Sequence, residues 1–180
     1  MRPVLAVTVL ILATLSHLRS LEWNSEERLW ASAVRTGPLM PRSHLCLGLA
    51  HKDRQDWIAA HEAFARCRDL AVDQHNASLA SRCWNNLGSL SLTLGQLDLA
   101  EMAYSQSLLL VPGYPDAMAN MASVWLERGD TAAAIKGYRE VLEMLPWHAQ
   151  TWTNLSLALA GRDSAGAAAA TAKAEKLMAR

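Results

Sequence analysis

A repeat of 34 residues constrains this 180-residue chain more than any other feature. The segment from Trp84 to Pro112 shows the pattern: a first helix that carries a tryptophan followed by small residues, a break, and a second helix that ends at a proline. The same residue sizes return between positions 118 and 146, and again from position 152 onward. A two-helix unit of this length cannot bury its apolar face alone, so consecutive units must stack on one another.

Glycines and prolines at fixed offsets support the division into helix pairs. Gly95 and Gly129 are expected to end the first helices of their units, because glycine adopts left-handed backbone angles at little cost. Pro112 and Pro146 are expected to end the second helices, because proline lacks the amide hydrogen that a continuing helix needs. These independent local signals agree on where each helix stops.

Small and acidic residues add to the same pattern. Ala100, Ala134 and Ala168 fall where helices are expected to cross closely, and a larger side chain would hold the helices apart. Asp98 and Asp130 are suited to cap the helices that follow them. Spacing, residue size and terminal proline thus agree over three registers, and the chain resembles the tetratricopeptide repeat (TPR) family. The resemblance implies an all-α fold, a right-handed TPR solenoid of about three and a half helix-turn-helix repeats behind an N-terminal hydrophobic helix.

The repeat pattern predicts how the chain is divided. The expected segments are a membrane anchor or signal segment (1–21), a half repeat (22–40), a first repeat (41–74), an insertion (75–80), a second repeat (81–114), a third repeat (115–148) and a fourth, capping repeat (149–180). The insertion is either a longer turn or a helix extension. Asn24 or Ser25 is expected to cap the helix of the half repeat. The alanine-rich last helix is expected to present a polar outer face, because nothing stacks on it.

The N-terminal region predicts membrane targeting. Residues 4–15 form an apolar run without charge. Taken to Leu15, the run has the length of a signal-peptide core, and taken to Leu21 it approaches the length of a membrane span. Two localisations follow: a membrane-anchored protein whose repeats face the ER lumen or periplasm, or a secreted or periplasmic protein after signal cleavage.

Composition argues against several classes of function. Seventeen basic and seventeen acidic residues leave no formal net charge, so the basic excess typical of nucleic-acid binders is missing. The three cysteines, Cys46, Cys67 and Cys83, form no CxxC pair, and their odd number and wide spacing argue against a disulfide framework or a zinc site. They are interpreted as core residues, and a single disulfide in an oxidising compartment stays open as the alternative.

No residue pattern predicts catalysis. The sequence contains no glycine-rich phosphate loop, no GxSxG and no HExxH. His44 and His51 share a helix face, but no Asp, Glu or Cys completes a set of metal ligands there. We therefore expect a protein that is not an enzyme and that has neither a cofactor nor a metal.

One polar set recurs with the repeat period. Asn86, Asn120 and Asn154 follow one another at 34-residue steps on the first helices, which line the concave wall of such a solenoid. Amide side chains there can donate to and accept from the backbone of an extended peptide. The set resembles the asparagine ladder of peptide-binding TPR proteins; the alternative is that these asparagines only cap or pack. The predicted groove is completed by neighbouring polar residues, which are Ser89, Ser123, Arg82, Asp116, Gln150 and Glu127.

The sequence thus predicts a membrane-tethered, non-catalytic interaction module whose concave groove binds an extended peptide or a partner helix. A second interpretation rests on the junction from Leu21 to Trp30. With the hydrophobic run before it, this junction resembles the C-terminal part of TPR-containing membrane protein O-mannosyltransferases and related bacterial membrane glycosyltransferases. That resemblance implies a C-terminal fragment of a multispanning enzyme, in which the repeats dock substrate. Self-association through stacking is the third alternative.

Overall fold

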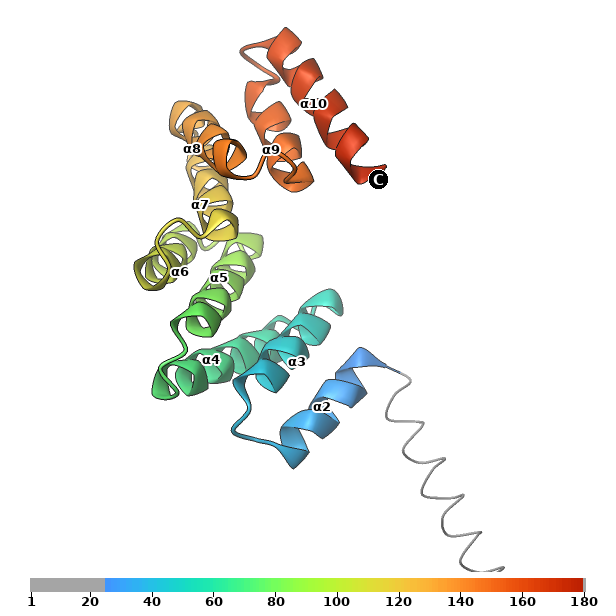
Figure 1. Cartoon of the computed structure of the whole chain (residues 1–180), viewed down its shortest axis with the longest axis vertical. Coiled ribbons are helices and arrows are strands. Elements are labelled where there is room, and N and C mark those ends of the chain that lie inside the picture. The colour runs from blue at the N-terminus through green and yellow to red at the C-terminus, as the bar shows by residue number, and fades with distance from the viewer. Residues whose placement is uncertain (1–24, 180) are drawn as a thin grey trace, which may run out of the picture. The chain divides into compact units, whose positions relative to one another are not determined.

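The computed structural model describes residues 25–179, and within this range the chain forms nine α-helices and no strand (Figure 1). The predicted all-α fold is therefore confirmed. The helix bounds are α2 (Glu26–Thr36), α3 (Pro41–Asp53), α4 (Trp57–Asp73), α5 (Ala77–Thr93), α6 (Leu97–Leu110), α7 (Pro115–Glu127), α8 (Thr131–Met144), α9 (Ala149–Leu159) and α10 (Ser164–Met178).

Contacts divide the chain into two units, Met1–Leu70 and Ala71–Arg180. In the first unit α2 packs on α3. The cap of α2 is Ser25, whose Oγ accepts a hydrogen bond of 3.3 Å from the Arg28 amide. Asn24, the alternative cap, lies outside the described residues. An ion pair between Glu27 and Arg54 links α2 to the end of α3.

The second unit contains three successive helix pairs, α5 with α6, α7 with α8, and α9 with α10. Each pair also contacts the next, through α6 with α7 and α8 with α9, and the first helices α5, α7 and α9 touch in sequence. Two core clusters fill this stack, one around Tyr104 and Val124 and the other around Tyr138 and Leu155. The first helices therefore form a row along the unit.

Each early helix pair is closed by a small residue of the first helix facing an aromatic ring of the second. A Cβ atom added at Gly48 would lie 2.6 Å from the Phe64 ring, and one added at Gly88 would lie 2.6 Å from the Tyr104 ring. Such an approach is far inside van der Waals contact, so any side chain there would push the two helices apart.

The turns confirm the helix ends expected from the sequence. Gly95 and Gly129 have φ angles of +71° and +85°, which is the left-handed region that glycine tolerates. The second helices α6 and α8 stop at Leu110 and Met144, two residues before the prolines at 112 and 146. Most of the stretch 75–80 lies in α5, because that helix begins at Ala77, so the stretch is a helix extension rather than a long turn.

The last helix departs from the predicted register. Ala100 and Ala134 are fully buried, as expected for close helix crossings, but Ala168 is exposed and Ala170 lies in the core instead. No aromatic residue occupies the α10 position that corresponds to Tyr104 and Tyr138. Without a ring to locate it, α10 packs on α9 through small residues. A 2.6 Å hydrogen bond between the hydroxyls of Ser156 and Thr171 joins the two helices.

Two of the three cysteines lie in the core, as the favoured interpretation predicted. Cys67 and Cys83 are disulfide-bonded, and both side chains are fully buried. Cys46 lies outside any disulfide. The core interpretation and the disulfide alternative therefore hold together for these two residues.

The predicted localisation is wrong for the described part of the chain. The sequence led us to expect a membrane-anchored protein with its repeats in the ER lumen or periplasm, or a secreted or periplasmic form. Among residues 25–179, no helix is both long and apolar enough to span a bilayer. The segment predicted as the anchor, residues 1–21, lies outside the described residues.

Candidate functional site

The predicted groove residues all lie in the second unit, on the three first helices that stand in a row (Figure 1). Helix α5 contributes Arg82, Asn86 and Ser89, helix α7 contributes Asp116, Asn120, Ser123 and Glu127, and helix α9 contributes Gln150 and Asn154. The asparagines and serines are half-buried, whereas Arg82, Glu127 and Gln150 are exposed.

The three asparagines use their amide nitrogens for contacts within the unit. Asn120 Nδ2 donates to Asn85 Oδ1 at 2.9 Å, which joins α7 to α5. Asn154 Nδ2 lies 3.5 Å from Ser123 Oγ, which joins α9 to α7. Asn86 Nδ2 donates to the Arg82 carbonyl of its own helix at 2.8 Å. The ladder thus connects neighbouring repeats, and each side-chain amide is held in place by its nitrogen.

The amide oxygens of the three asparagines differ in whether they accept a hydrogen bond. Asn154 Oδ1 accepts a 3.0 Å hydrogen bond from Gln150 Nε2. The Oδ1 atoms of Asn86 and Asn120 accept no hydrogen bond from any residue that the structure describes. Two acceptors on adjacent first helices are therefore available to a ligand that carries N–H groups.

Ser123 links three helices of the second unit through hydrogen bonds. Its Oγ forms a hydrogen bond of 3.1 Å with the Ala119 carbonyl and one of 2.9 Å with the Tyr138 hydroxyl. Burial raises the pKa of Tyr138, and the hydrogen bond to Ser123 opposes that rise. Ser123 therefore joins α7 to α8 and supports the amide of Asn154 from α9.

A second polar set runs along the N-terminal ends of the same helices. The Tyr114 hydroxyl donates to Asp116 Oδ2 at 2.9 Å, and His148 Nε2 lies 3.6 Å from Asp116 Oδ1. His148 Nδ1 in turn forms a 2.6 Å hydrogen bond with Thr151 Oγ1. Burial, followed by the Asp116 charge, raises the pKa of Tyr114 to about 12, while Arg82 acts in the opposite direction. Arg82 and Asp116 are thus engaged with the turn that precedes the next repeat.

Sequence reasoning missed four residues of this site. Tyr114 and His148 stand 34 residues apart, so the repeat period could have identified them as equivalent positions. Leu157 stands 34 residues after Ser123 and is 66% exposed, which adds an apolar position to the predicted groove. Asn85 has no such signal, because the equivalent positions 119 and 153 hold Ala and Thr.

The described residues offer no metal centre. Within residues 25–179, no three His, Cys, Asp or Glu side chains lie close enough together to hold a metal ion. The polar groups of the site are hydrogen-bond donors and acceptors at the surface of a helix row, an arrangement that suits the binding of a polypeptide backbone.

Comparison with known proteins identifies both the family and the fold. The model of the CABIN1 N-terminal domain matches residues 50–157, which is more than half of the chain. No curated protein sequence matches the chain significantly.

Among solved structures, that of MamA is 20% identical with a TM-score of 0.62, covering 84% of this chain and 86% of its own. YrrB, described as a TPR protein with an unusual peptide-binding site, is 17% identical with a TM-score of 0.58, covering 92% of this chain and 81% of its own. The Rap conjugation gene regulator of plasmid pLS20, in complex with the Phr* peptide, is 19% identical with a TM-score of 0.69, covering 77% of this chain and 41% of its own. These structural likenesses show a TPR-type solenoid fold, and the sequence match over residues 50–157 shows that the chain belongs to the CABIN1 N-terminal domain family.

Proposed function

We propose that this chain is a non-catalytic protein-interaction module that binds an extended peptide along α5, α7 and α9. The observation that carries the proposal is the pair of amide oxygens on Asn86 and Asn120. They stand 34 residues apart on adjacent first helices, and each is fixed through its own nitrogen while the oxygen has no described partner. Acceptors held in this way lose little conformational freedom when a ligand binds.

The spacing of the helices fits an extended ligand. Packed helix axes lie roughly 8–10 Å apart, and an extended chain advances about 3.3 Å per residue. Asn86 and Asn120 therefore match N–H groups about three residues apart on the ligand backbone. Recognition through backbone atoms reads the direction of the peptide with little preference for its side chains.

Side-chain preference comes from the residues around the ladder. Arg82 in the second turn of α5 and Glu127 at the end of α7 carry opposite charges, and Leu157 adds an apolar contact. No cluster of basic residues on these helices forms a clamp for a terminal carboxylate. The likeness of fold to YrrB and to the peptide-bound Rap regulator supports a peptide as the ligand class.

The test uses Asn86→Ala in the full-length chain, with Gln106→Ala on the exposed surface of α6 as the matched control. A linear 12-residue peptide selected from a random display library on the wild-type chain serves as the probe. We expect Asn86→Ala to weaken its binding about fivefold, since one hydrogen bond contributes roughly 1 kcal/mol. Isothermal titration calorimetry measures the affinity. Asn86 is preferred to Asn120 for this test, because removing Asn120 also leaves the buried Asn85 amide without its partner.

A second experiment, with chemically modified peptides, identifies which backbone N–H group contacts Asn86. Methylating, one at a time, each backbone nitrogen of the probe peptide removes its N–H groups in turn. At one position the methyl group is expected to weaken binding to the wild-type chain but not to Asn86→Ala, because the two changes remove the same hydrogen bond. Equal affinities of the wild-type chain, Asn86→Ala and Gln106→Ala would contradict the proposal.

A further inference from the structure

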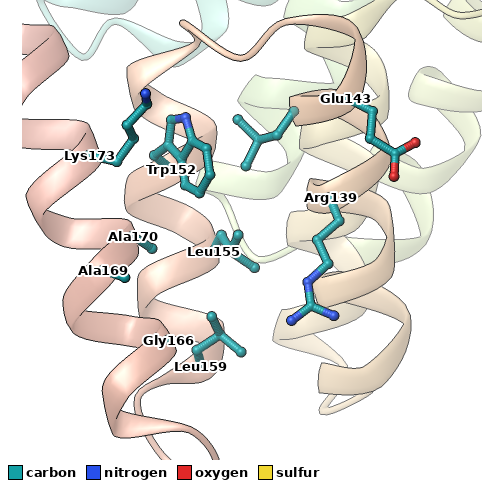
Figure 2. A pocket seen from close by; sticks show the side chains of 10 residues that line it. Arg139, Glu143, Trp152, Leu155, Leu159, Gly166, Ala169, Ala170 and Lys173 are labelled. Carbon is teal, nitrogen blue, oxygen red and sulfur yellow. The ribbon is translucent and has the colours of Figure 1, made fainter.

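A hollow of about 580 Å³ opens between α8, α9 and α10 in the second unit (Figure 2). Its floor is the apolar stripe Trp152, Leu155 and Leu159 of α9, and Figure 2 shows α8 on one side of this stripe and α10 on the other. A volume of this size lies in the range of ligand sites, which is about 300–1,000 Å³. None of its residues belongs to the groove proposed above.

The hollow follows from the small residues of the last helix. Its α10 wall consists of Gly166, Ala169 and Ala170, with Lys173 at one end (Figure 2). The second helices α6 and α8 contribute a buried tyrosine to the core, but α10 has none. Space that a larger side chain would occupy in a full repeat therefore stays open beside α9.

The floor of the hollow is fixed before any ligand arrives. The Trp152 indole nitrogen donates a 2.9 Å hydrogen bond to the Pro146 carbonyl, which holds the ring in one orientation. Leu155 and Leu159 are 4% and 6% exposed and belong to the core cluster beneath. Trp152 is half-buried, so its ring supplies most of the open apolar surface of the floor.

The hollow and the peptide groove lie on opposite sides of α9. A helix turns about 100° per residue, so Trp152, Leu155 and Leu159 fall within one narrow sector. Gln150 and Asn154, the α9 residues of the groove, fall about half a turn away from that sector. A ligand in one place does not occupy the other.

Unpaired cations flank the apolar floor. Arg139 on α8 and Lys173 on α10 are exposed, and neither makes an ion pair or hydrogen bond with any residue in the described range. Figure 2 places them on opposite walls, whereas the Glu143 carboxylate points away from the floor. The lining of the hollow thus carries two cations and one anion, and its net charge is positive.

We propose that this hollow binds a short amphipathic helix of a partner protein, with acidic residues on both flanks of its apolar face. The floor residues recur at i, i+3 and i+7, which spans about 10 Å along α9 and matches two turns of a bound helix. A helix satisfies its own backbone groups, whereas an extended peptide would bury unpaired N–H and C=O groups against these apolar side chains. Carboxylates on the two flanks complement Arg139 and Lys173.

The probe is a fluorescein-labelled, lactam-bridged helix of about twelve residues, with leucines at i, i+3 and i+7 and glutamates on both flanks. A second peptide, identical except for lysines in place of the glutamates, is its control. Fluorescence anisotropy with the full-length chain measures binding. We expect the acidic peptide to bind at least about tenfold more tightly than the basic one, and the difference to shrink as salt is added.

Two pairs of variants locate the site. Ala169→Trp fills the hollow from α10 and is expected to weaken binding of the acidic peptide at least about tenfold, whereas Ala168→Trp, on the same helix but outside the hollow, leaves it unchanged. Arg139→Glu and Lys173→Glu are each expected to weaken binding about threefold to tenfold. Asn86→Ala leaves this binding unchanged, which separates the hollow from the groove.

Three results would overturn the proposal. The first is equal binding of the acidic and basic peptides, and the second is undiminished binding to Ala169→Trp when circular dichroism shows that the variant is folded. The third is evidence that something else occupies the hollow. If sedimentation shows concentration-dependent dimers and Ala169→Trp abolishes them, the occupant is a second copy of this chain. If the chain binds decanoate but not the acidic peptide, and Ala169→Trp abolishes decanoate binding, the occupant is a small amphiphile.

Discussion

Tyr104 and Tyr138 occupy equivalent places in consecutive repeats, and both side chains are fully buried. They differ in one hydrogen bond. The Tyr138 hydroxyl pairs with Ser123 Oγ at 2.9 Å, whereas the Tyr104 hydroxyl is buried without a hydrogen-bond partner among the described residues. A buried polar group costs free energy when it is unpaired and stabilises the fold modestly when it is paired.

The two tyrosines therefore predict opposite results for the same substitution. Tyr138→Phe should lower the free energy of unfolding by about 1 kcal/mol, because it removes a buried hydrogen bond. Tyr104→Phe should leave the free energy of unfolding unchanged or raise it by up to about 1 kcal/mol, because it removes an unsatisfied hydroxyl. Urea denaturation of both variants measures the difference. A loss of similar size in both would show that the Tyr104 hydroxyl has a partner.

For individual residues, the sequence predicts the position on a helix but not the hydrogen-bond partner. The 34-residue period placed Asn86, Asn120 and Asn154 on one face of the first helices, and the structure places them on α5, α7 and α9. The period did not reveal that Asn120 donates to Asn85 while Asn86 donates within its own helix. That difference depends on which neighbouring residue lies within about 3 Å, and Asn85 has no equivalent in the other repeats.

The second helices begin in different ways, although the sequence suggested a common cap. Asp130 is the N-cap of α8, and its Oδ1 accepts a 3.0 Å hydrogen bond from the Ala133 amide. Asp98 lies inside the first turn of α6, where the N-cap is Gln96, and its Oδ1 forms a 2.6 Å ion pair with Arg128. The prediction of a capping role is therefore confirmed for Asp130 and wrong for Asp98.

The two aspartates should respond differently to removal and to salt. Asp130→Ala should cost about 1 kcal/mol of stability, and most of that loss should remain in about 1 M salt, because the capping hydrogen bond is local. Asp98→Ala should cost less than about 0.5 kcal/mol, and that loss should disappear in about 1 M salt, because its exposed ion pair is screened. Thermal melts of both variants at low and high salt test this. A loss for Asp130→Ala that disappears completely in about 1 M salt would be inconsistent with its role as a cap.

Local residue chemistry explains why the sequence located the ends of most helices well but the core-facing side of α10 poorly. Gly95, Gly129 and the two prolines after α6 and α8 end helices by their own backbone chemistry, so their effect can be read locally. In α10 almost every position facing α9 is alanine or glycine. Without contrast in side-chain size, the sequence cannot show which alanine faces the core, and the structure buries Ala170 rather than Ala168.

All three tyrosines of the chain have raised pKa values. Burial is the largest cause in each case, and for Tyr114 burial together with Asp116 raises the pKa from 10.0 to about 12. The folded chain therefore keeps its phenol protons at pH values where the unfolded chain has lost them. Because the unfolded state binds fewer protons there, the stability contributed by the raised pKa values is complete below about pH 10 and falls as the pH rises further.

The raised tyrosine pKa values predict that the free energy of unfolding of the whole molecule falls at alkaline pH. Urea denaturation from about pH 8 to about pH 11.5 should show constant stability at first and a decline above about pH 10. Tyr114→Phe should decline less steeply than the wild-type chain, because it removes one of the linked groups. Near-ultraviolet absorbance of the folded chain should show ionisation of Tyr114 near pH 12 rather than pH 10. Ionisation of all three tyrosines near pH 10 in the folded chain would refute the prediction.

The contact of Gly48 with Phe64 and of Gly88 with Tyr104 has a consequence for how such a chain changes during evolution. The glycine is on one helix and the ring is on the next, so neither can be replaced alone without a clash or a void. A duplication or crossover that keeps both helices together preserves the fit, whereas one that cuts between them joins mismatched halves. Natural recombination and engineered chimaeras should therefore tolerate breakpoints after the second helix of a pair far better than breakpoints at the turn within it.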